Sequence, residues 1–406
     1  MTQPQSHVAM PAEAALRQTR DASGKLAGIV LVLPAYLPES FGGAEQQTRK
    51  LAIALARLGV RVSVLAPRLL SHTARREQDV SIALWRFKLR KAPSLGGRYI
   101  GSLLSWSAKL FWWLIRHRAQ YQVIHIIHGR LHAVPAVIAG FLLGKPTLIK
   151  IGRGGSEHFD LDLLSRKRVL GGWYARMIVE HASAYIANSS DIVKDLRRWE
   201  IPADRIHRIP NGVEIPHLAP ATSNTGTPRF VYLGRLDPEK AVDLMIRGFA
   251  QLADHEPARL TIVGDGKCRR DLEMLVDELG VTDRVSFSGS VTDVSGALRV
   301  ADVFVSTSLS EGMSNALLEA MSFGVMPLVS SVSGAADIVD DCRSGLLFGS
   351  GDLEAFVVKL REAIALTPEA RRAIGLAGRE SVVSRYGIDQ VAKRHLALYE
   401  HLLSDR

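Results

Sequence analysis

The stretch Ser308-Leu309-Ser310-Glu311-Gly312-Met313-Ser314-Asn315-Ala316-Leu317-Leu318-Glu319-Ala320-Met321 decides the fold. The apolar run just before it, residues 303–305, predicts a buried strand. Ser314 or Asn315 is the expected cap of a following helix. A strand that ends in a polar loop and a helix N-terminus is a common ligand site of parallel α/β sheets. Glu311 and Glu319, eight residues apart, are placed to grip two ends of a polyhydroxylated ligand, or they are two carboxylates with no common partner.

Two more junctions of the same kind lie upstream. In Phe230-Val231-Tyr232-Leu233-Gly234-Arg235-Leu236-Asp237-Pro238-Glu239-Lys240, a predicted strand ends at a glycine. The two cations Arg235 and Lys240 follow in a loop that leads into a helix. Such a pair suits a diphosphate, because arginine offers a planar fork of donors and lysine a point charge. The third junction, residues 260–266, places Gly264 directly after an apolar run.

With these junctions the sequence resembles the retaining glycosyltransferases of the GT-B fold that carry a Glu-x7-Glu signature, glycosyltransferase family 4, of the bacterial envelope and exopolysaccharide type. The resemblance covers nearly the whole chain. It implies an α/β fold of two Rossmann-like domains that face each other across a cleft, with a C-terminal helix that crosses back to the first domain. It further implies transfer of a hexose from a UDP- or GDP-sugar to a glycan or lipid-linked glycan, with no metal and no other cofactor.

The resemblance also implies roles for single residues. Arg235 and Lys240 would neutralise the leaving diphosphate, Glu311 would hold hydroxyls of the transferred sugar, and Glu319 would hold the ribose diol. The residues expected to be catalytic are Arg235, Lys240, Glu311 and His128. Those expected to bind the donor are Gly42, Gly43, Gly234, Gly264, Gly312, Met313, Ser314, Asn315, Leu317 and Glu319.

The first half of the chain has its own candidates. Gly42 and Gly43 follow the predicted strand 28–34 and resemble the family's Gly-Gly-x-Glu loop, where backbone amides can approach a ligand. His125 and His128 lie at the end of the predicted strand 123–127. His125 is the expected core histidine and His128 resembles the family's cleft histidine, although the spacing leaves the choice between them open.

Length and composition predict two domains in one soluble chain of 406 residues. We expect a disordered lead-in over residues 1–27, an acceptor domain over 28–217, a linker over 218–228, a donor domain over 229–385 and a returning helix over 386–406. The two cysteines, Cys268 and Cys342, have neither metal-ligand nor disulfide spacing, which fits a reducing cytoplasm.

Charge is distributed unevenly along the chain. Residues 1–220 hold 31 Lys and Arg against 15 Asp and Glu, whereas the remainder holds 20 against 26. The basic half suggests an anionic partner, and the chain has no motif typical of nucleic-acid binding. Residues 99–118 combine three tryptophans with flanking Arg and Lys. This segment is predicted to be either a core helix or an interfacial helix on an anionic membrane, at the inner face of the cytoplasmic membrane.

Three further local patterns could bear on ligand binding, and each has a structural interpretation or departs from the family's pattern. Lys150 and Arg153 flank a glycine-rich loop and are expected to be solvated surface charges, with contact to an acceptor phosphate as the alternative. Asp160-Leu161-Asp162 spells a metal motif of another glycosyltransferase fold, which we discount because the resembled family needs no metal. Asp337 lies where members of the resembled family usually have Glu, so we do not assign the family's ligand contacts at this position to Asp337.

Other classes of protein are open alternatives. A nucleotide-sugar epimerase or a glycan phosphorylase can share the two-domain fold. A dinucleotide-dependent oxidoreductase would explain Gly264 and Gly266, but the third glycine and the downstream acidic residue of that fingerprint are missing. A non-catalytic, membrane-bound nucleotide sensor would leave the cation pair and the two glutamates unexplained.

Overall fold

The computed structural model describes residues 26–40, 42–69, 73, 76–79, 82–89, 100–155, 159–168, 170–217 and 227–405. Residues 1–25 of the predicted lead-in and residues 218–226 of the predicted linker lie outside this part of the chain. The chain folds into two compact units. Unit 1 comprises Met1–Lys150, Leu164–Tyr185 and His395–Arg406, and unit 2 comprises Ile151–Leu163 and Ile186–Arg394.

The first sheet has eight strands in the order β3-β4-β2-β1-β5-β6-β7-β8. Its centre is β1, a continuous apolar run whose residues are all buried, as expected for a parallel strand covered on both faces. The strand β3, at one edge, runs antiparallel to β4. The strands are β1 (Gly28–Val32), β2 (Arg61–Arg68), β3 (Arg76–Asp79), β4 (Ile82–Lys88), β5 (Val123–Ile127), β6 (Thr147–Ile151), β7 (Ala184–Ala187) and β8 (Ile206–Arg208).

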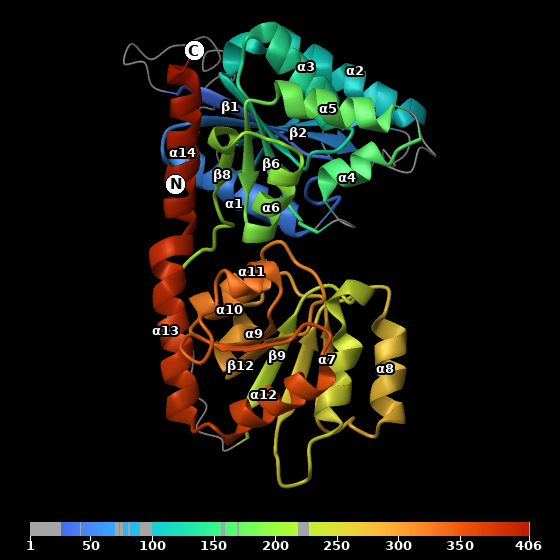
Figure 1. Ribbon diagram of the computed structural model, residues 1–406, viewed down its shortest axis with the longest axis vertical. Coiled ribbons are helices and arrows are strands. Elements are labelled where there is room, and N and C mark those ends of the chain that lie inside the picture. The colour runs from blue at the N-terminus through green and yellow to red at the C-terminus, as the bar shows by residue number, and fades with distance from the viewer. Residues whose placement is uncertain are drawn as a thin grey trace, which may run out of the picture. The chain divides into compact units, whose positions relative to one another are not determined.

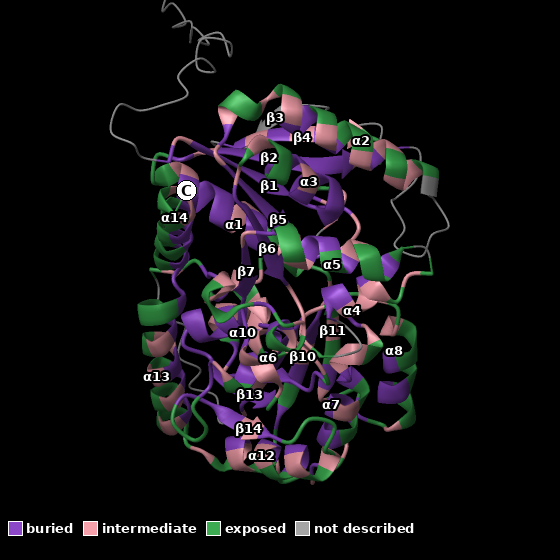
Figure 2. Ribbon diagram, turned by 45° about the horizontal axis from the view of Figure 1, so that its top comes forward, coloured by how far each residue is buried: buried purple, intermediate pink, exposed green. Residues whose placement is uncertain are grey.

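Helices alternate with these strands along the chain (Figure 1). They are α1 (Gly43–Arg57), α2 (Ile100–Arg116), η2 (Arg118–Gln120), α3 (Ala133–Leu143), α4 (Asp160–Ser165), α5 (Gly171–His181), α6 (Ser190–Arg198) and η3 (Ala203–Arg205). The segment predicted as either a core or an interfacial helix forms α2 and has two faces. Trp106 and Trp113 are buried, whereas Leu104 and Trp112 are exposed, as the alternating colours along α2 show (Figure 2).

The second sheet lies in unit 2 and has the order β11-β10-β9-β12-β13-β14, with every pairing parallel. The strands are β9 (Arg229–Leu233), β10 (Arg259–Val263), β11 (Val285–Gly289), β12 (Val303–Ser306), β13 (Met326–Ser330) and β14 (Leu346–Phe348). The helices are η4 (Pro238–Lys240), α7 (Val242–Phe249), α8 (Arg269–Glu278), α9 (Ser295–Val300), α10 (Asn315–Ser322), α11 (Ser333–Ala336), α12 (Leu353–Ala365), α13 (Pro368–Tyr386) and α14 (Ile388–Ser404).

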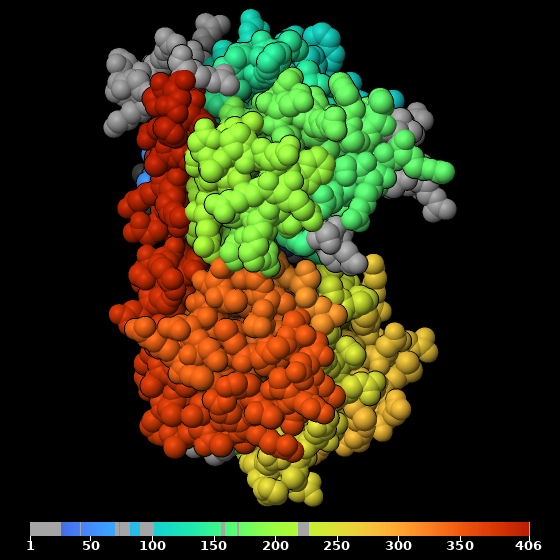
Figure 3. Space-filling view, in the orientation of Figure 1, coloured from blue at the N-terminus to red at the C-terminus, as the bar shows by residue number. Residues whose placement is uncertain are grey.

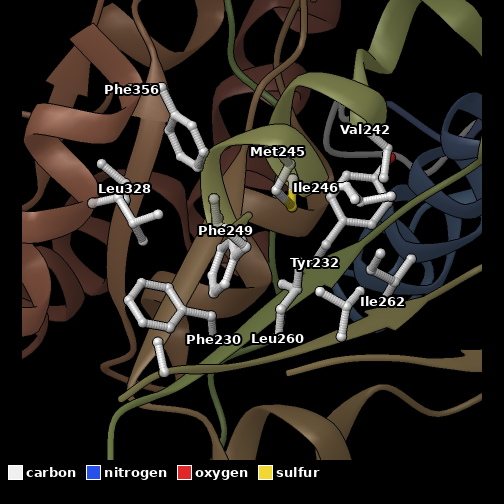
Figure 4. Packing of buried hydrophobic residues seen from close by; sticks show 14 of the residues in the cluster. Phe230, Tyr232, Val242, Met245, Ile246, Phe249, Leu260, Ile262, Leu328 and Phe356 are labelled. Atoms are coloured by element: carbon white, nitrogen blue, oxygen red, sulfur yellow. The ribbon is translucent and has the colours of Figure 1, made fainter. Parts of the chain in front are cut away.

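The second sheet is buried on both faces, and strand periodicity explains how. Successive side chains of β9 point to opposite faces, so Phe230 and Tyr232 belong to one core cluster and Val231 and Leu233 to the other. In the first cluster the ring of Phe230 meets that of Phe249 from α7 edge to face, at 5.2 Å between centroids (Figure 4). This packing fixes β9 and therefore the loop that leaves it.

The C-terminal part of α14, from His395, belongs to unit 1 and is the dark red end of the chain in Figures 1 and 3. Its Tyr399 hydroxyl lies 2.7 Å from Nδ1 of His125, and both side chains are buried. His125 is thus a core histidine, as predicted, that ties β5 to α14.

Candidate functional site

Three loops leave the carboxyl ends of the neighbouring strands β10, β9 and β12 in unit 2. The first two touch directly: a Cβ on Gly264 would lie 1.8 Å from the carbonyl oxygen of Gly234. Backbone hydrogen bonds join the same loops, from the Gly234 amide to the Val263 oxygen (3.1 Å) and from the Leu236 amide to the Asp265 oxygen (2.9 Å). Gly264 is therefore required by this close approach, whatever ligand it also meets, whereas a Cβ on Gly234 would meet the Tyr232 hydroxyl at 2.8 Å.

The loop after β9 is also fastened to the loop after β12. The Thr307 hydroxyl donates to the carbonyl oxygen of Ala241 (2.8 Å), and the Leu309 amide donates to that of Glu239 (2.9 Å). Thr307 is fully buried, so these bonds have no competing solvent. Residues 235–240, which carry Arg235 and Lys240, are called the cation motif below. The two hydrogen bonds place this motif beside Glu311, the first glutamate of the Glu-x7-Glu signature.

The predicted catalytic cations and the first glutamate are brought together by this arrangement. The Lys240 ammonium forms an ion pair with the Glu311 carboxylate, and both side chains are mostly buried. Arg235 is more exposed and contacts two carboxylates, those of Asp237 (2.5 Å) and Glu239 (3.4 Å). Each predicted cation of the site therefore meets a carboxylate of the protein itself.

Glu239 is one of the site residues that the sequence analysis did not single out. Its two carboxylate oxygens accept both Nη atoms of Arg153, at 2.7 and 3.1 Å, in the bidentate geometry that strengthens such pairs. Burial alone raises the pKa of Glu239, but the hydrogen bonds and charge of Arg153, together with Lys240 and Arg235, hold this pKa below its ordinary value. Glu239 is consequently an anion at neutral pH.

The Glu-x7-Glu stretch has the predicted loop-and-helix form. Ser314 caps α10, since its hydroxyl accepts the Leu317 amide (3.3 Å). Asn211 holds the start of the helix, with its side-chain amide donating to Asn315 Oδ1 (2.9 Å) and to the Met313 oxygen (3.3 Å). Gly312 is buried, and a Cβ there would lie 2.2 Å from the carbonyl oxygen of Gly152.

The remaining predicted residues are distributed between the units. Glu319 is half-buried within α10 of unit 2, beyond the loop that holds Glu311, as the spacing predicted. Gly42 and Gly43 begin α1 in unit 1. His128 follows β5 in unit 1 with a positive φ of 72°, and its amide donates to the Lys150 oxygen (2.9 Å). Their roles toward a ligand stay predictions.

The expectation that Lys150 and Arg153 are solvated surface charges is wrong. Lys150 is buried, and this burial lowers the pKa of its ammonium to about 8. The Arg153 guanidinium forms an ion pair with the Glu239 carboxylate. Asp162 of the Asp-Leu-Asp triplet pairs with Arg198 and accepts the Trp199 indole N–H (2.8 Å), which gives it a structural role.

Asp337 replaces the glutamate expected from the family and has a structural partner set of its own. Its carboxylate accepts the amide (2.8 Å) and hydroxyl (3.0 Å) of Ser190 and pairs with Arg208 (2.8 Å). Asn211, Thr307 and Glu239 contact the site loops without having been predicted to do so. Only Glu239 carried a sequence signal, because it falls inside the cation motif.

Comparison with known families divides the chain in two. Residues 41–216 match the model of Glycosyltransferase Family 4, and residues 217–381 match that of Glycosyl transferases group 1. A GDP-mannose-dependent alpha-mannosyltransferase of Mycolicibacterium smegmatis is 30% identical over 278 residues, which cover 65% of this chain and 69% of that protein. The lipopolysaccharide core biosynthesis glycosyltransferase LpsD of Rhizobium meliloti is 28% identical over 51% of this chain and 60% of its own.

Solved structures share the fold. Sucrose-phosphate synthase of Thermosynechococcus elongatus superposes with a TM-score of 0.78 at 22% identity, covering 94% of this chain and all of that one. HepE of Anabaena, in complex with UDP and glucose, gives 0.72 at 19% identity over 93% of this chain and all of its own. The two parallel sheets thus have the architecture of GT-B glycosyltransferases, as predicted.

The chain is a glycosyltransferase and belongs to glycosyltransferase family 4. Within the described residues, no helix combines the length and apolarity needed to cross a bilayer.

Proposed function

We propose that this enzyme transfers a hexose from a UDP- or GDP-sugar to a glycan or lipid-linked glycan of the cell envelope, with retention at the anomeric carbon and without a metal. The observation that carries the proposal is the Lys240–Glu311 pair, set beside Arg235 at the carboxyl edge of a parallel sheet. Cations there meet a diphosphate, and a carboxylate beside them meets sugar hydroxyls.

In the proposed reaction the bond between the anomeric carbon and the diphosphate oxygen breaks. The acceptor oxygen bonds to the anomeric carbon on the same face, and the acceptor's proton passes to an oxygen of the leaving diphosphate. Arg235 and Lys240 stabilise the negative charge that grows on the diphosphate, a contribution worth about 3–4 kcal/mol for each well-placed donor. The amides that open α10 add a second source of positive potential.

The two glutamates have separate tasks in this proposal. Glu311 leaves Lys240 when the diphosphate enters and accepts hydroxyls of the transferred sugar. Glu319, further along α10, accepts the ribose diol of the nucleotide. Relatives support a donor of this class: one is named for its dependence on GDP-mannose, and HepE is solved with UDP and glucose.

The test is product formation from a panel of UDP- and GDP-hexoses with glycan and lipid-linked acceptors, read by NMR at the new anomeric centre. The expected product keeps the donor's α-configuration without added metal and in the presence of a chelator. A product of inverted configuration, or release of epimerised donor with no acceptor consumed, would contradict the proposal.

We also propose that α2 brings the enzyme to an anionic membrane surface at the inner face of the cytoplasmic membrane. Leu104 and Trp112 are 63% and 67% exposed on α2, and Phe141 and Leu142 are 63% and 62% exposed on α3, the helix that packs against it. The exposed residues of α2 are seen in Figure 2. Arg116 and Arg118, both exposed at the C-terminal end of this segment, add affinity for anionic headgroups.

Sedimentation with phosphatidylglycerol vesicles tests this docking. Trp112→Ser is expected to reduce the bound fraction, because an aromatic side chain at headgroup depth is lost. Val358→Ser, which alters an equally exposed apolar residue of α12 in unit 2, is the control and leaves binding unchanged. Equal binding of wild type and Trp112→Ser, or equal binding to neutral vesicles, would refute the docking proposal.

A further inference from the structure

The site loops of unit 2 hold their own counter-ions. Among the described residues there, the cations Arg153, Arg235 and Lys240 contact the carboxylates of Asp237, Glu239 and Glu311. A diphosphate brings additional negative charge into these loops, so some of these pairs must exchange partners when it binds. One of the three carboxylates is bound more closely by a cation outside the cation motif than by the cations within it.

That carboxylate belongs to Glu239. Its Oε1 lies 2.7 Å from Nη2 of Arg153 but 3.4 Å from Nη2 of Arg235. Its Oε2 accepts a second bond from Arg153 Nη1, at 3.1 Å. The side chains of Arg153 and Glu239 are 35% and 23% exposed, so the pair is partly shielded from water. Arg153 is therefore the stronger partner by distance and by geometry.

Arg153 is held in place by its own loop. The preceding residue, Gly152, has a carbonyl oxygen that would lie 2.2 Å from a Cβ on Gly312, so the backbone after β6 abuts the Glu311 loop. Two residues further on, the Gly155 amide donates to Asp195 (2.6 Å). The backbone is thus held on both sides of Arg153. A side chain on such a backbone is suited to bind one carboxylate at a constant position and less suited to follow a mobile ligand.

We propose that Arg153 is a positioning residue for the donor: it draws the Glu239 carboxylate away from Nη2 of Arg235 and so leaves that side of the guanidinium to the donor's diphosphate, while Nη1 is paired with Asp237. This inference rests on the proposed function and assigns a task to a residue outside the cation motif. Without Arg153, Glu239 would turn to Arg235, its neighbour four residues earlier, and would compete with the diphosphate for that guanidinium.

If Arg153 bound the phosphate directly, the double variant would be expected to behave differently. If Arg153 itself bound the diphosphate, its loss would weaken binding whether or not Glu239 carried a charge. If it acts by sequestering Glu239, neutralising Glu239 removes the competitor and makes Arg153 dispensable. The two substitutions Arg153→Gln and Glu239→Gln, alone and combined, separate these cases.

The experiment is titration calorimetry of UDP and GDP, without acceptor, on the full chain. For whichever nucleotide the wild type binds, Arg153→Gln is expected to raise Kd about tenfold, the scale of one charge-assisted hydrogen bond. Glu239→Gln is expected to lower Kd about threefold, because Arg235 loses one competing carboxylate. The double variant is expected within about threefold of wild type, so that Glu239→Gln rescues Arg153→Gln.

A matched control removes a similar pair elsewhere. Arg361 on α12 contacts Glu256 at 3.0 Å, and Arg361→Gln makes the same change in charge without touching the site loops. It leaves Kd unchanged, and the melting temperatures of all variants report whether the fold is intact. Arg153→Lys keeps the charge but loses the bidentate fork, and its Kd is expected between those of wild type and Arg153→Gln.

Four results would overturn the inference, and the last of them would overturn the proposed function as well. A double variant as weak as Arg153→Gln would make Arg153 a direct ligand of the diphosphate. A Glu239→Gln variant weaker than wild type would make Glu239 a contact that binding needs. A wild type that binds UDP or GDP with no change in any of the variants would make the pair a structural contact only. A wild type that binds neither nucleotide would overturn the proposed function itself, and the inference with it.

Discussion

Gly264→Ala tests whether the exits of β9 and β10 are packed as closely as the structure shows. The added Cβ would lie 1.8 Å from the Gly234 carbonyl oxygen and 2.9 Å from its carbon. Carbon and oxygen atoms that are not bonded keep about 3.3 Å apart. The two loops would therefore have to separate by about 1.5 Å, since a backbone oxygen, unlike a side chain, cannot rotate away.

Separation of the loops has a cost that the structure allows us to estimate. The hydrogen bond from the Leu236 amide to the Asp265 oxygen would be lost, at about 1 kcal/mol, and overpacking strain adds about 1–3 kcal/mol. The positive φ of Gly264, 151°, is a further penalty for alanine. We expect a total destabilisation of about 3 kcal/mol, which lowers the melting temperature of unit 2 by roughly 6–12 °C.

Scanning calorimetry measures this shift, and the chain provides a matched control. Gly296 in α9 has nothing within 4 Å of an added Cβ, so Gly296→Ala is expected to be neutral or to stabilise by about 0.5–1 kcal/mol. If Gly264→Ala melted within 1 °C of Gly296→Ala, the close approach of the two loops would be refuted, and with it the packing explanation for this glycine.

Further predictions concern catalysis, the helix start and pH. Lys240→Ala is expected to lower kcat by about 10²–10³-fold with nucleotide Kd little changed, measured by steady-state kinetics and calorimetry, because the charge it meets grows in the transition state; an unchanged kcat contradicts this. Asn211→Ala is expected to destabilise unit 2 by about 1–2 kcal/mol in calorimetry, since the Asn315 side chain and the Met313 oxygen lose a donor; no change would remove this contact from the account. Burial, with the charges of nearby His395 and Lys150, holds the pKa of His125 well below 6.5, so the unfolded chain binds a proton that the folded chain does not. Stability is thus expected to fall more steeply in wild type than in His125→Gln as pH drops below about 6.5, by up to about 1.4 kcal/mol per pH unit; parallel pH profiles of the two would contradict it.

The sequence predicted the strands of unit 2 well because local pattern and burial agree there. The run 230–233 is apolar, and β9 is buried on both faces; likewise residues 303–305 form the fully buried β12. The division of the two glutamates between loop and helix followed from their spacing and from the cap at Ser314. Each of these features depends on residues close together in the chain.

The partners of the site residues could not be predicted in this way. Glu239 and Arg153 are 86 positions apart, and nothing local to either shows that they meet. The burial of Lys150 was missed for a related reason: the lysine belongs to β6, a strand inside the sheet whose five residues are all buried. Pairings between distant segments come from topology, which sequence pattern alone leaves open.

The central claim is that the Glu-x7-Glu stretch binds a nucleoside diphosphate, and a thermal-shift panel of UDP, GDP, ADP and NAD tests it most directly. Wild type is expected to be stabilised by UDP or GDP, and Glu319→Ala to lose most of that shift while melting near wild type without ligand. A shift with NAD alone, no shift with any nucleotide, or a full shift retained by Glu319→Ala would contradict the account.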